Sequence, residues 1–221
     1  MHAHVNRWRI VLAAVLLPCG CDRGSEAQPP VVADTVPSVN ADLSEELIRL
    51  GLLDQTARAG YTTQVLSDTA YLRASLVIDS VLTRRLRRII AEHGWPAVSV
   101  VGREAAQAAF LIVQHSPSDT FQREALPLLD SAAAAGEASG ADVAMLTDRI
   151  RVHDGKPQLY GTQFRIVDET LVPYPIEDIA NLDGRRAAVG LMPMDDYAQL
   201  LRDTYRGTVR WPPDSTPSPP S

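Results

Sequence analysis

The chain has 221 residues, with 27 Asp and Glu against 21 Lys and Arg and a formal net charge of −6 at pH 7. An acidic chain is a poor candidate for binding nucleic acid, because the phosphate backbone attracts basic surfaces. We therefore expect no nucleic-acid partner.

Residues 1–20 are typical of a bacterial secretory signal peptide, with a basic start and an apolar run over residues 10–17. This run is too short for a membrane-spanning helix, which needs about 20 residues. Gly20 before Cys21 matches a lipoprotein cleavage site, so we expect cleavage before Cys21 and acylation of that cysteine. Cleavage before Cys19 and simple secretion are the alternatives.

A lipid on Cys21 would attach the mature chain to a membrane of the cell envelope, facing the periplasm or the cell exterior. Cys21 would then be the one cysteine left, so no disulfide and no thiolate metal site is expected. The remaining histidines form no helical His pair, and we expect neither a metal nor a cofactor.

Composition divides the rest of the chain into three parts. Residues 21–41 are rich in Pro, Ala, Val, Ser and acidic residues, which predicts a flexible, lipid-anchored linker. Residues 208–221 are rich in Pro and predict a disordered tail. Between them, residues 42–207 have the size of a single domain.

Helical spacing of apolar residues predicts the first part of this domain. Asp42 and Glu45 form the pattern of a capping box, and a helix is expected from there to about Ala59. A second helix is expected from near Thr62 to His93. Its apolar stripe is predicted to contain Leu72, Ile78, Val81, Leu82, Leu86, Ile89 and Ile90.

Three further helices are expected in the middle of the domain. The first spans about Val100 to His115, and the next follows it with Pro117 at its first helical position. The third is capped within residues 139–142 and has Leu146 on its inward face.

The last part predicts strands before two short helices. Residues 158–167 have strand-like alternation, and a turn at 168–170 leads into a second strand at 171–174. Helices are then expected near 185–189 and 195–206. The predicted fold class is mostly α (α+β): a single helical domain with a late antiparallel β-hairpin.

Three short motifs concentrate polar residues in otherwise apolar surroundings: 114–115, 147–149 and 155–164. No G-x-S-x-G, H-E-x-x-H, P-loop or cysteine pair is present in the sequence. The common hydrolase, zinc-protease and nucleotide-binding classes therefore lose their support.

These motifs carry a family resemblance. His93-Gly94-Trp95-Pro96, Leu111-Ile112-Val113-Gln114-His115, Leu146-Thr147-Asp148-Arg149, the stretch 155–164 and Pro175-Ile176-Glu177-Asp178 occur in this order. The chain resembles an uncharacterised bacterial domain-of-unknown-function family over about residues 75 to 200. Members often have an acid soon after the Gln-His pair, where this chain has Ser116-Pro117-Ser118. The resemblance implies no activity.

His115, Asp148 and Arg149 are the candidate catalytic residues. His115 has the chemistry of a general acid or base, and Asp148 would orient it. Arg149 is suited to clamp a carboxylate or phosphate through two parallel hydrogen bonds. The alternatives are a helix-terminal histidine held by carbonyl groups, a surface pair between Asp148 and Arg151, and an Arg149 that ties the helix to the hairpin.

The candidate ligand-binding residues lie in the predicted first strand and just before it. Two glutamines and a glycine contribute nothing to the core of a two-stranded ribbon, so this stretch is a candidate ligand wall. The alternative is a buried structural network. The candidates are Lys156, Gln158, Tyr160, Thr162 and Gln163.

The sequence thus predicts an envelope lipoprotein that binds a small polar ligand or an envelope component between the His115 corner and the hairpin. One alternative is a His- and Asp-dependent hydrolase or lyase acting on envelope material. The other is an interaction module whose polar residues stabilise the fold.

Overall fold

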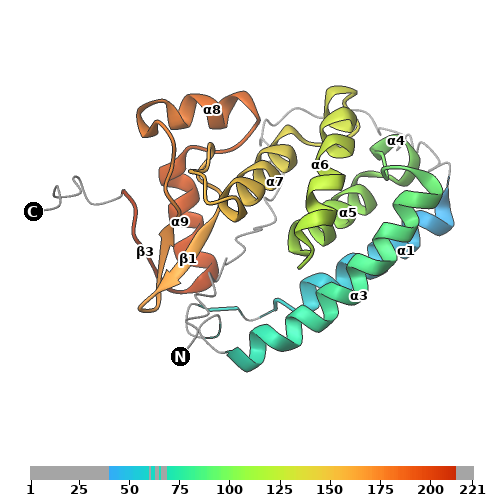
Figure 1. Ribbon diagram of the computed structural model, residues 1–221, viewed down its shortest axis with the longest axis horizontal. Helices are drawn as coiled ribbons and strands as arrows, with labels where there is room; N and C mark the ends of the chain where they lie inside the picture. Colours follow the sequence, from blue (N-terminus) through green and yellow to red (C-terminus); the bar gives the residue numbers. More distant parts are fainter. Residues whose placement is uncertain (1–39, 60, 63–64, 66–68, 213–221) are drawn as a thin grey trace, which may run out of the picture.

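The computed structural model describes residues 40–59, 61–62, 65 and 69–212. The expected signal peptide, Cys21 and nearly all of the expected linker lie outside these residues. Within them, the fold is mostly α with a small sheet near the C-terminal end, which confirms the predicted class (Figure 1). No helix in the described part of the chain is long and apolar enough to cross a membrane.

The helical body fills one side of the molecule (Figure 1). Its apolar core draws buried side chains from all of its helices, with Leu47, Leu86 and Ile112 at or near zero exposure. Its helices are α1 (Ala41–Thr56), α3 (Thr69–His93), α4 (Val98–Val101), α5 (Arg103–His115), α6 (Asp119–Ala134) and α7 (Gly140–His153).

The remaining elements pack around a second apolar cluster beside α7, which includes Phe164, Leu171 and Leu201. The strands β1 and β2 form the predicted antiparallel hairpin, in which Val167 pairs with Thr170. The elements of this part are β1 (Phe164–Val167), β2 (Thr170–Pro173), a 3₁₀ turn (Ile179–Asn181), α8 (Leu182–Ala188), α9 (Met194–Tyr205) and β3 (Thr208–Val209).

Two helix starts differ from the predictions. The side chain of Asn40, not of Asp42, caps α1 by accepting a hydrogen bond from the backbone N–H of Leu43 at 3.0 Å. Ser118 caps α6 in the same way, so Pro117 precedes the cap and is not the first helical residue. In both cases a side-chain acceptor stands one residue before the first turn, where N–H groups lack helical partners.

Two predicted helices differ from those in the structure. The helix expected from about Val100 is divided, because Gly102 has a φ of 81° and separates α4 from α5. In the second predicted helix, Thr62 is not helical and α3 is described from Thr69. The predicted apolar stripe of α3 is also partly wrong, because Ile78 and Val81 are exposed, whereas Ser75 and Asp79 are buried.

The sheet differs from the prediction in two ways: its first strand is shorter, and it contains a third strand. Residues 158–163 form a loop, and β1 begins at Phe164. Thr208 and Val209 lie in the expected tail, yet they form β3, which pairs in parallel with β2. The described fold therefore extends beyond the predicted boundary at residue 207.

Candidate functional site

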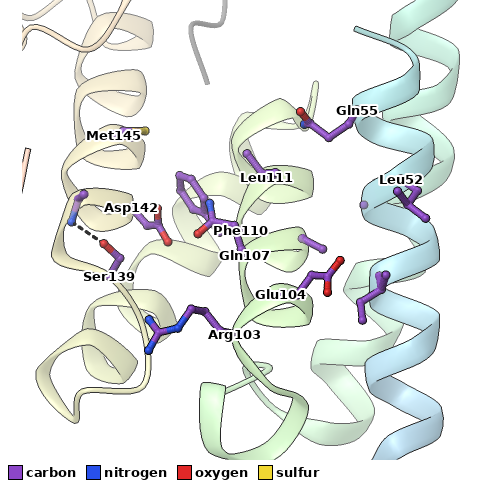
Figure 2. A pocket seen from close by; sticks show the side chains of 14 residues that line it. Leu52, Gln55, Arg103, Glu104, Gln107, Phe110, Leu111, Ser139, Asp142 and Met145 are labelled. Atoms are coloured by element: carbon purple, nitrogen blue, oxygen red, sulfur yellow. Dashed lines mark hydrogen bonds between the residues drawn. The ribbon is translucent and has the colours of Figure 1, made fainter. Parts of the chain in front are cut away.

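The central candidate residues come from three helices that run side by side in the same direction. Figure 2 shows α1, α5 and α7 in this arrangement, with Gln55, Leu111 and Met145 toward one end. His115 is the last residue of α5, and Arg149 lies in the second half of α7. The carbonyl ends of helices favour nearby cations, so this end of the bundle suits basic side chains.

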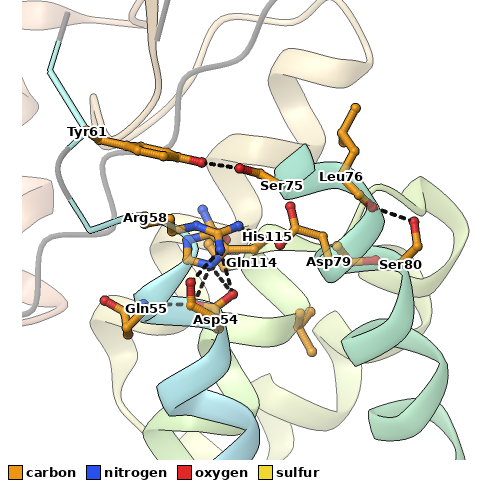
Figure 3. Close-up of polar contacts among 12 residues, drawn as sticks. Asp54, Gln55, Arg58, Tyr61, Ser75, Leu76, Asp79, Ser80, Gln114 and His115 are labelled. Atoms are coloured by element: carbon orange, nitrogen blue, oxygen red, sulfur yellow. Dashed lines mark hydrogen bonds and ion pairs between the residues drawn. The ribbon is translucent and has the colours of Figure 1, made fainter. Parts of the chain in front are cut away.

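His115 and Asp54 form a buried pair. The imidazole Nδ1 lies 2.7 and 2.9 Å from the two carboxylate oxygens of Asp54 (Figure 3). The exposed fractions of the two side chains are 1% and 0%. Gln55 Nε2 donates to Asp54 Oδ2 at 2.7 Å and fixes the second carboxylate oxygen.

Arg58 connects this pair to a second buried acid. Its Nη1 lies 3.0 Å from Asp54 Oδ1, and its Nη2 donates to Asp79 Oδ1 at 2.8 Å. Burial raises the pKa of Asp79, although the charge of Arg58 opposes this shift. We call Asp54, Arg58, Asp79, His115 and Arg149 the polar cluster.

The imidazole of His115 is neutral at pH 7. Burial lowers its pKa to about 4, and the charge of Arg58 adds to this effect. For Asp54, burial alone would raise the pKa, but hydrogen bonding and charge from His115 and Arg58 lower it. The Nδ1–H group of the neutral imidazole donates a hydrogen bond to the ionised Asp54, which leaves Nε2 as an acceptor. Nε2 is buried and has no hydrogen-bond partner among the described residues.

Arg149 is the second unpartnered group of the polar cluster. Its side chain is buried, and neither Nε nor Nη2 has a hydrogen-bond partner in the part of the chain that the structure describes. Burial lowers the pKa of Arg149 to about 9, helped by the positive charge of Arg58, so the guanidinium is still protonated at pH 7. Its charge in turn lowers the pKa of His115 and of Asp79, so it acts on both.

Asp148 does not orient His115, because the carboxylate that bonds the imidazole is that of Asp54. Asp148 instead accepts hydrogen bonds from the loop 158–163. Nor does it pair with Arg151, whose Nη2 bonds Glu177 at 2.5 Å. The donors to Asp148 are Leu159 N (2.6 Å), Tyr160 N (3.1 Å), Thr162 N (3.1 Å) and Thr162 Oγ1 (2.9 Å).

The glutamines fold this loop onto itself. Gln158 Nε2 donates to the carbonyl groups of Gln163 and Tyr174, at 3.0 and 2.9 Å, and its Oε1 accepts from Gln163 N at 2.8 Å. Gly161 has a φ of 69°, a conformation that favours glycine. Gln158 therefore stabilises the loop as part of a buried structural network, as the alternative interpretation predicts. A contact between Gln158 and a ligand stays a prediction.

Lys156 lies apart from these groups. Its side chain is exposed, and its Nζ is 3.5 Å from Asp154. The structure thus divides the predicted site residues into three sets. His115 and Arg149 belong to the polar cluster, while Asp148, Gln158, Tyr160, Thr162 and Gln163 build the loop.

Asp54, Arg58 and Asp79 are not among the site residues predicted from the sequence, but the sequence contains a signal for the two acids. Leu43, Leu47, Gly51 and Asp54 follow one another at helical spacing and are all buried. Asp79 has the same relation to Leu82 and Leu86 on α3. A carboxylate at a core position is costly unless it is paired, so an acid that continues an apolar stripe indicates a buried cation or imidazole nearby.

The described residues define a mostly helical α+β domain with a buried cluster of His, Asp and Arg side chains. Among them, no group of three or more His, Cys, Asp or Glu is placed to hold a metal ion. The chain belongs to a family of unknown function (DUF6624), whose model matches residues 41–210. This confirms the resemblance to an uncharacterised domain family. No curated protein and no solved structure matched the chain.

Proposed function

We propose that this protein is a cell-envelope lipoprotein whose domain binds a small polar ligand, or an envelope component, through an acidic group of that ligand. The binding groups are Arg149 and His115, within the polar cluster. The observation that carries the proposal is the buried guanidinium of Arg149, with Nε and Nη2 unpartnered among the described residues.

A buried cation needs a counter-charge. Removing a guanidinium from water without an anionic partner costs on the order of several kcal/mol. Arg58 has two acidic partners, Asp54 and Asp79, whereas Arg149 forms no ion pair with a described residue. A carboxylate or phosphate would supply two acceptors in the geometry that the guanidinium favours.

His115 adds selectivity to the same cluster. Its neutral Nε2 accepts a hydrogen bond, so it would recognise a hydroxyl, an amide N–H or a protonated acid on the ligand. Together, Arg149 and His115 support a ligand with an anionic group and an adjacent donor.

The test uses inorganic phosphate and acetate as probes. Thermal unfolding of the full chain is followed by circular dichroism at rising concentrations of each anion, with sodium chloride at equal ionic strength for comparison. We expect one of the two anions to raise Tm more than chloride does, because an anion that binds the folded state stabilises it.

Arg149→Met should abolish this response and still fold, since replacing a buried charge by an apolar side chain of similar volume is often neutral or stabilising. Arg84→Met makes the same change at an exposed position on α3 and should respond like the original chain. Equal responses of Arg149→Met and the original chain would refute the proposal. A chain that responds to neither anion would favour the structural interaction module.

A second candidate is a His-dependent hydrolase or lyase acting on envelope material, and the Asp54–His115 geometry favours it. A neutral imidazole held by a carboxylate at Nδ1 is suited to take a proton at Nε2 from water or substrate. Arg149 would stabilise the developing negative charge. Hydrolysis of p-nitrophenyl acetate that His115→Ala abolishes would support this candidate, and a rate unaffected by that change would oppose it.

A further inference from the structure

A second candidate site lies in a groove between α1, α5 and α7. The groove encloses about 620 Å³, within the range of roughly 300 to 1,000 Å³ that is typical of small-molecule sites. Helix α5 forms its floor, and α1 and α7 form its walls (Figure 2). Its apolar lining includes Ile48, Leu52, Phe110, Leu111 and Met145.

Asp142 brings a buried acid into this apolar groove. Its exposed fraction is 8%, and Figure 2 shows its side chain directed from α7 toward Gln107 and Phe110 on α5. Besides burial, the one group that acts on the pKa of this carboxyl group is the neutral side chain of Gln107, which lowers it. Burial raises the pKa of Asp142 to about 7, so a large share of this carboxyl group is ionised at neutral pH.

The other charged side chains of the groove do not compensate Asp142. Arg103 and Glu104 also line it, from α5. In Figure 2, Arg103 extends toward the segment before α7, and Glu104 points toward α1. No ion pair between Asp142 and a cation is found in the described part of the chain.

Helix capping does not account for Asp142 either. Asp142 is the third residue of α7, where an acid can bond back to the residue at the cap. The cap of α7 is instead made by Ser139, whose Oγ accepts from the N–H of Ala141 at 3.1 Å. The Asp142 side chain is turned away from the cap and into the space between α5 and α7 (Figure 2).

We propose that this groove binds a small apolar molecule that carries a protonated amine, with the amine paired to Asp142. The amine would supply the counter-charge that a carboxylate in an apolar environment requires. The alkyl or aromatic part of the ligand would pack against Phe110, Leu111 and Met145, where each buried CH₂ group contributes about 0.8 kcal/mol. A carboxylate at Asp142 would disfavour an acidic group of the ligand at the same position.

The test compares three probes with the same six-carbon chain: hexylamine, hexan-1-ol and hexanoate. Binding to the full chain is measured by NMR titration of the Met145 methyl and Gln107 side-chain amide resonances. We expect hexylamine to bind about tenfold or more tightly than hexan-1-ol, and hexanoate more weakly than both. Equal affinities of hexylamine and hexan-1-ol would overturn the proposal, as would amine binding that leaves both resonances unshifted.

Two variants identify the acid. Asp142→Asn keeps the shape and should reduce hexylamine affinity to that of hexan-1-ol, while hexan-1-ol affinity stays unchanged. Glu104→Gln removes the other acid of the groove and should change hexylamine affinity by less than about threefold. Full hexylamine affinity in Asp142→Asn would overturn the proposal.

A measurement on the original chain keeps the test decisive if Asp142→Asn does not fold. The ¹³C carboxyl resonance of Asp142 is titrated with acid, with and without saturating hexylamine. A bound ammonium group favours the ionised carboxylate, so we expect the midpoint to move to lower pH by about one pH unit or more. An unchanged midpoint would refute the pairing. The result does not depend on the polar cluster, because none of its residues lines the groove.

Discussion

Asp148 and Arg149 are consecutive residues of α7, yet they act in two different polar networks. Asp148 accepts hydrogen bonds from Leu159, Tyr160 and Thr162 in the loop before β1. Arg149 belongs to the polar cluster and lowers the pKa of His115. Successive residues of a helix are rotated by about 100° around its axis, so one turn of α7 serves both networks. Holding the loop in place therefore also fixes the helix that carries Arg149.

Asp148→Asn should destabilise the fold by about 3 kcal/mol. An asparagine keeps one acceptor, but its amide group would face N–H donors that the carboxylate now satisfies, and buried unsatisfied donors cost about 1 to 3 kcal/mol each. The free energy of unfolding is measured by urea denaturation. Asp130→Asn, on the exposed side of α6, is the matched control and should change this free energy by less than about 0.5 kcal/mol. Similar losses in both variants would contradict this role of Asp148.

The sequence predicts the secondary-structure elements better than it predicts which side chains pair with one another. The helical body and the hairpin follow from local patterns: apolar spacing on helices, caps, and a two-residue turn at Asp168 and Glu169, whose φ angles are positive. The pairing of His115 depends on a contact across 61 residues of sequence. Other acidic residues lie at comparable sequence separations from His115. The position of Asp148 in a motif favours it as the partner of His115, whereas the packing of α1 against α5 brings Asp54 to His115 instead.

The loop 158–163 differs from its predicted structure for another reason. Its alternating pattern is that of a strand, and backbone pairing would ordinarily satisfy its N–H groups. In the structure, the carboxylate of Asp148 and the side chain of Gln158 accept those hydrogen bonds instead. A side chain that accepts these bonds in place of a neighbouring strand leaves no periodic pattern in the sequence. The predicted strand therefore begins six residues before β1.

Asp54 and His115 should be energetically coupled. Asp54→Asn, His115→Ala and the double variant form a cycle, and we expect a coupling free energy of about 1 to 3 kcal/mol because the two groups are in contact and buried. Urea denaturation supplies the four free energies of unfolding. The exposed pair of Glu45 and Arg49 is the control, with an expected coupling below about 0.5 kcal/mol. Additive effects at Asp54 and His115 would contradict the pairing.

Cys21→Ser should release the protein from membranes into the soluble fraction, because a hydroxyl group does not accept the lipid that a thiol does. The check is fractionation of cells that produce the original chain or the variant, with intact-mass measurement of the mature N-terminus. Cys19→Ser should leave the protein in the membrane fraction. An unmodified N-terminus, or cleavage well beyond Cys21, would show that the lipoprotein prediction is wrong.

His115 should make the protein less stable as pH falls from 6.5 to 4. Burial lowers the folded-state pKa of His115 from 6.5 to about 4, so in this window the unfolded state binds a proton that the folded state does not. The free energy of unfolding then falls by up to about 1.4 kcal/mol per pH unit on acidification, and is unaffected above this range. His115→Asn should remove this contribution, which urea denaturation at a series of pH values measures. Equal pH dependences of the variant and the original chain would exclude a buried neutral His115.

Asp142 should have the opposite effect over nearly the same range. Burial raises its folded-state pKa from 3.8 to about 7, so between these pH values the folded state holds a proton that the unfolded state has lost. The contribution of Asp142 is therefore fully present below pH 3.8 and is lost as pH rises through about 7.

Because the slopes from His115 and Asp142 oppose each other, the original chain can show a nearly flat curve between pH 4 and 6.5. Comparison with single variants resolves them: relative to Asp142→Asn, the original chain should lose stability as pH rises from 4 to 7. A constant difference between these two chains across that range would show that Asp142 titrates as an ordinary exposed acid.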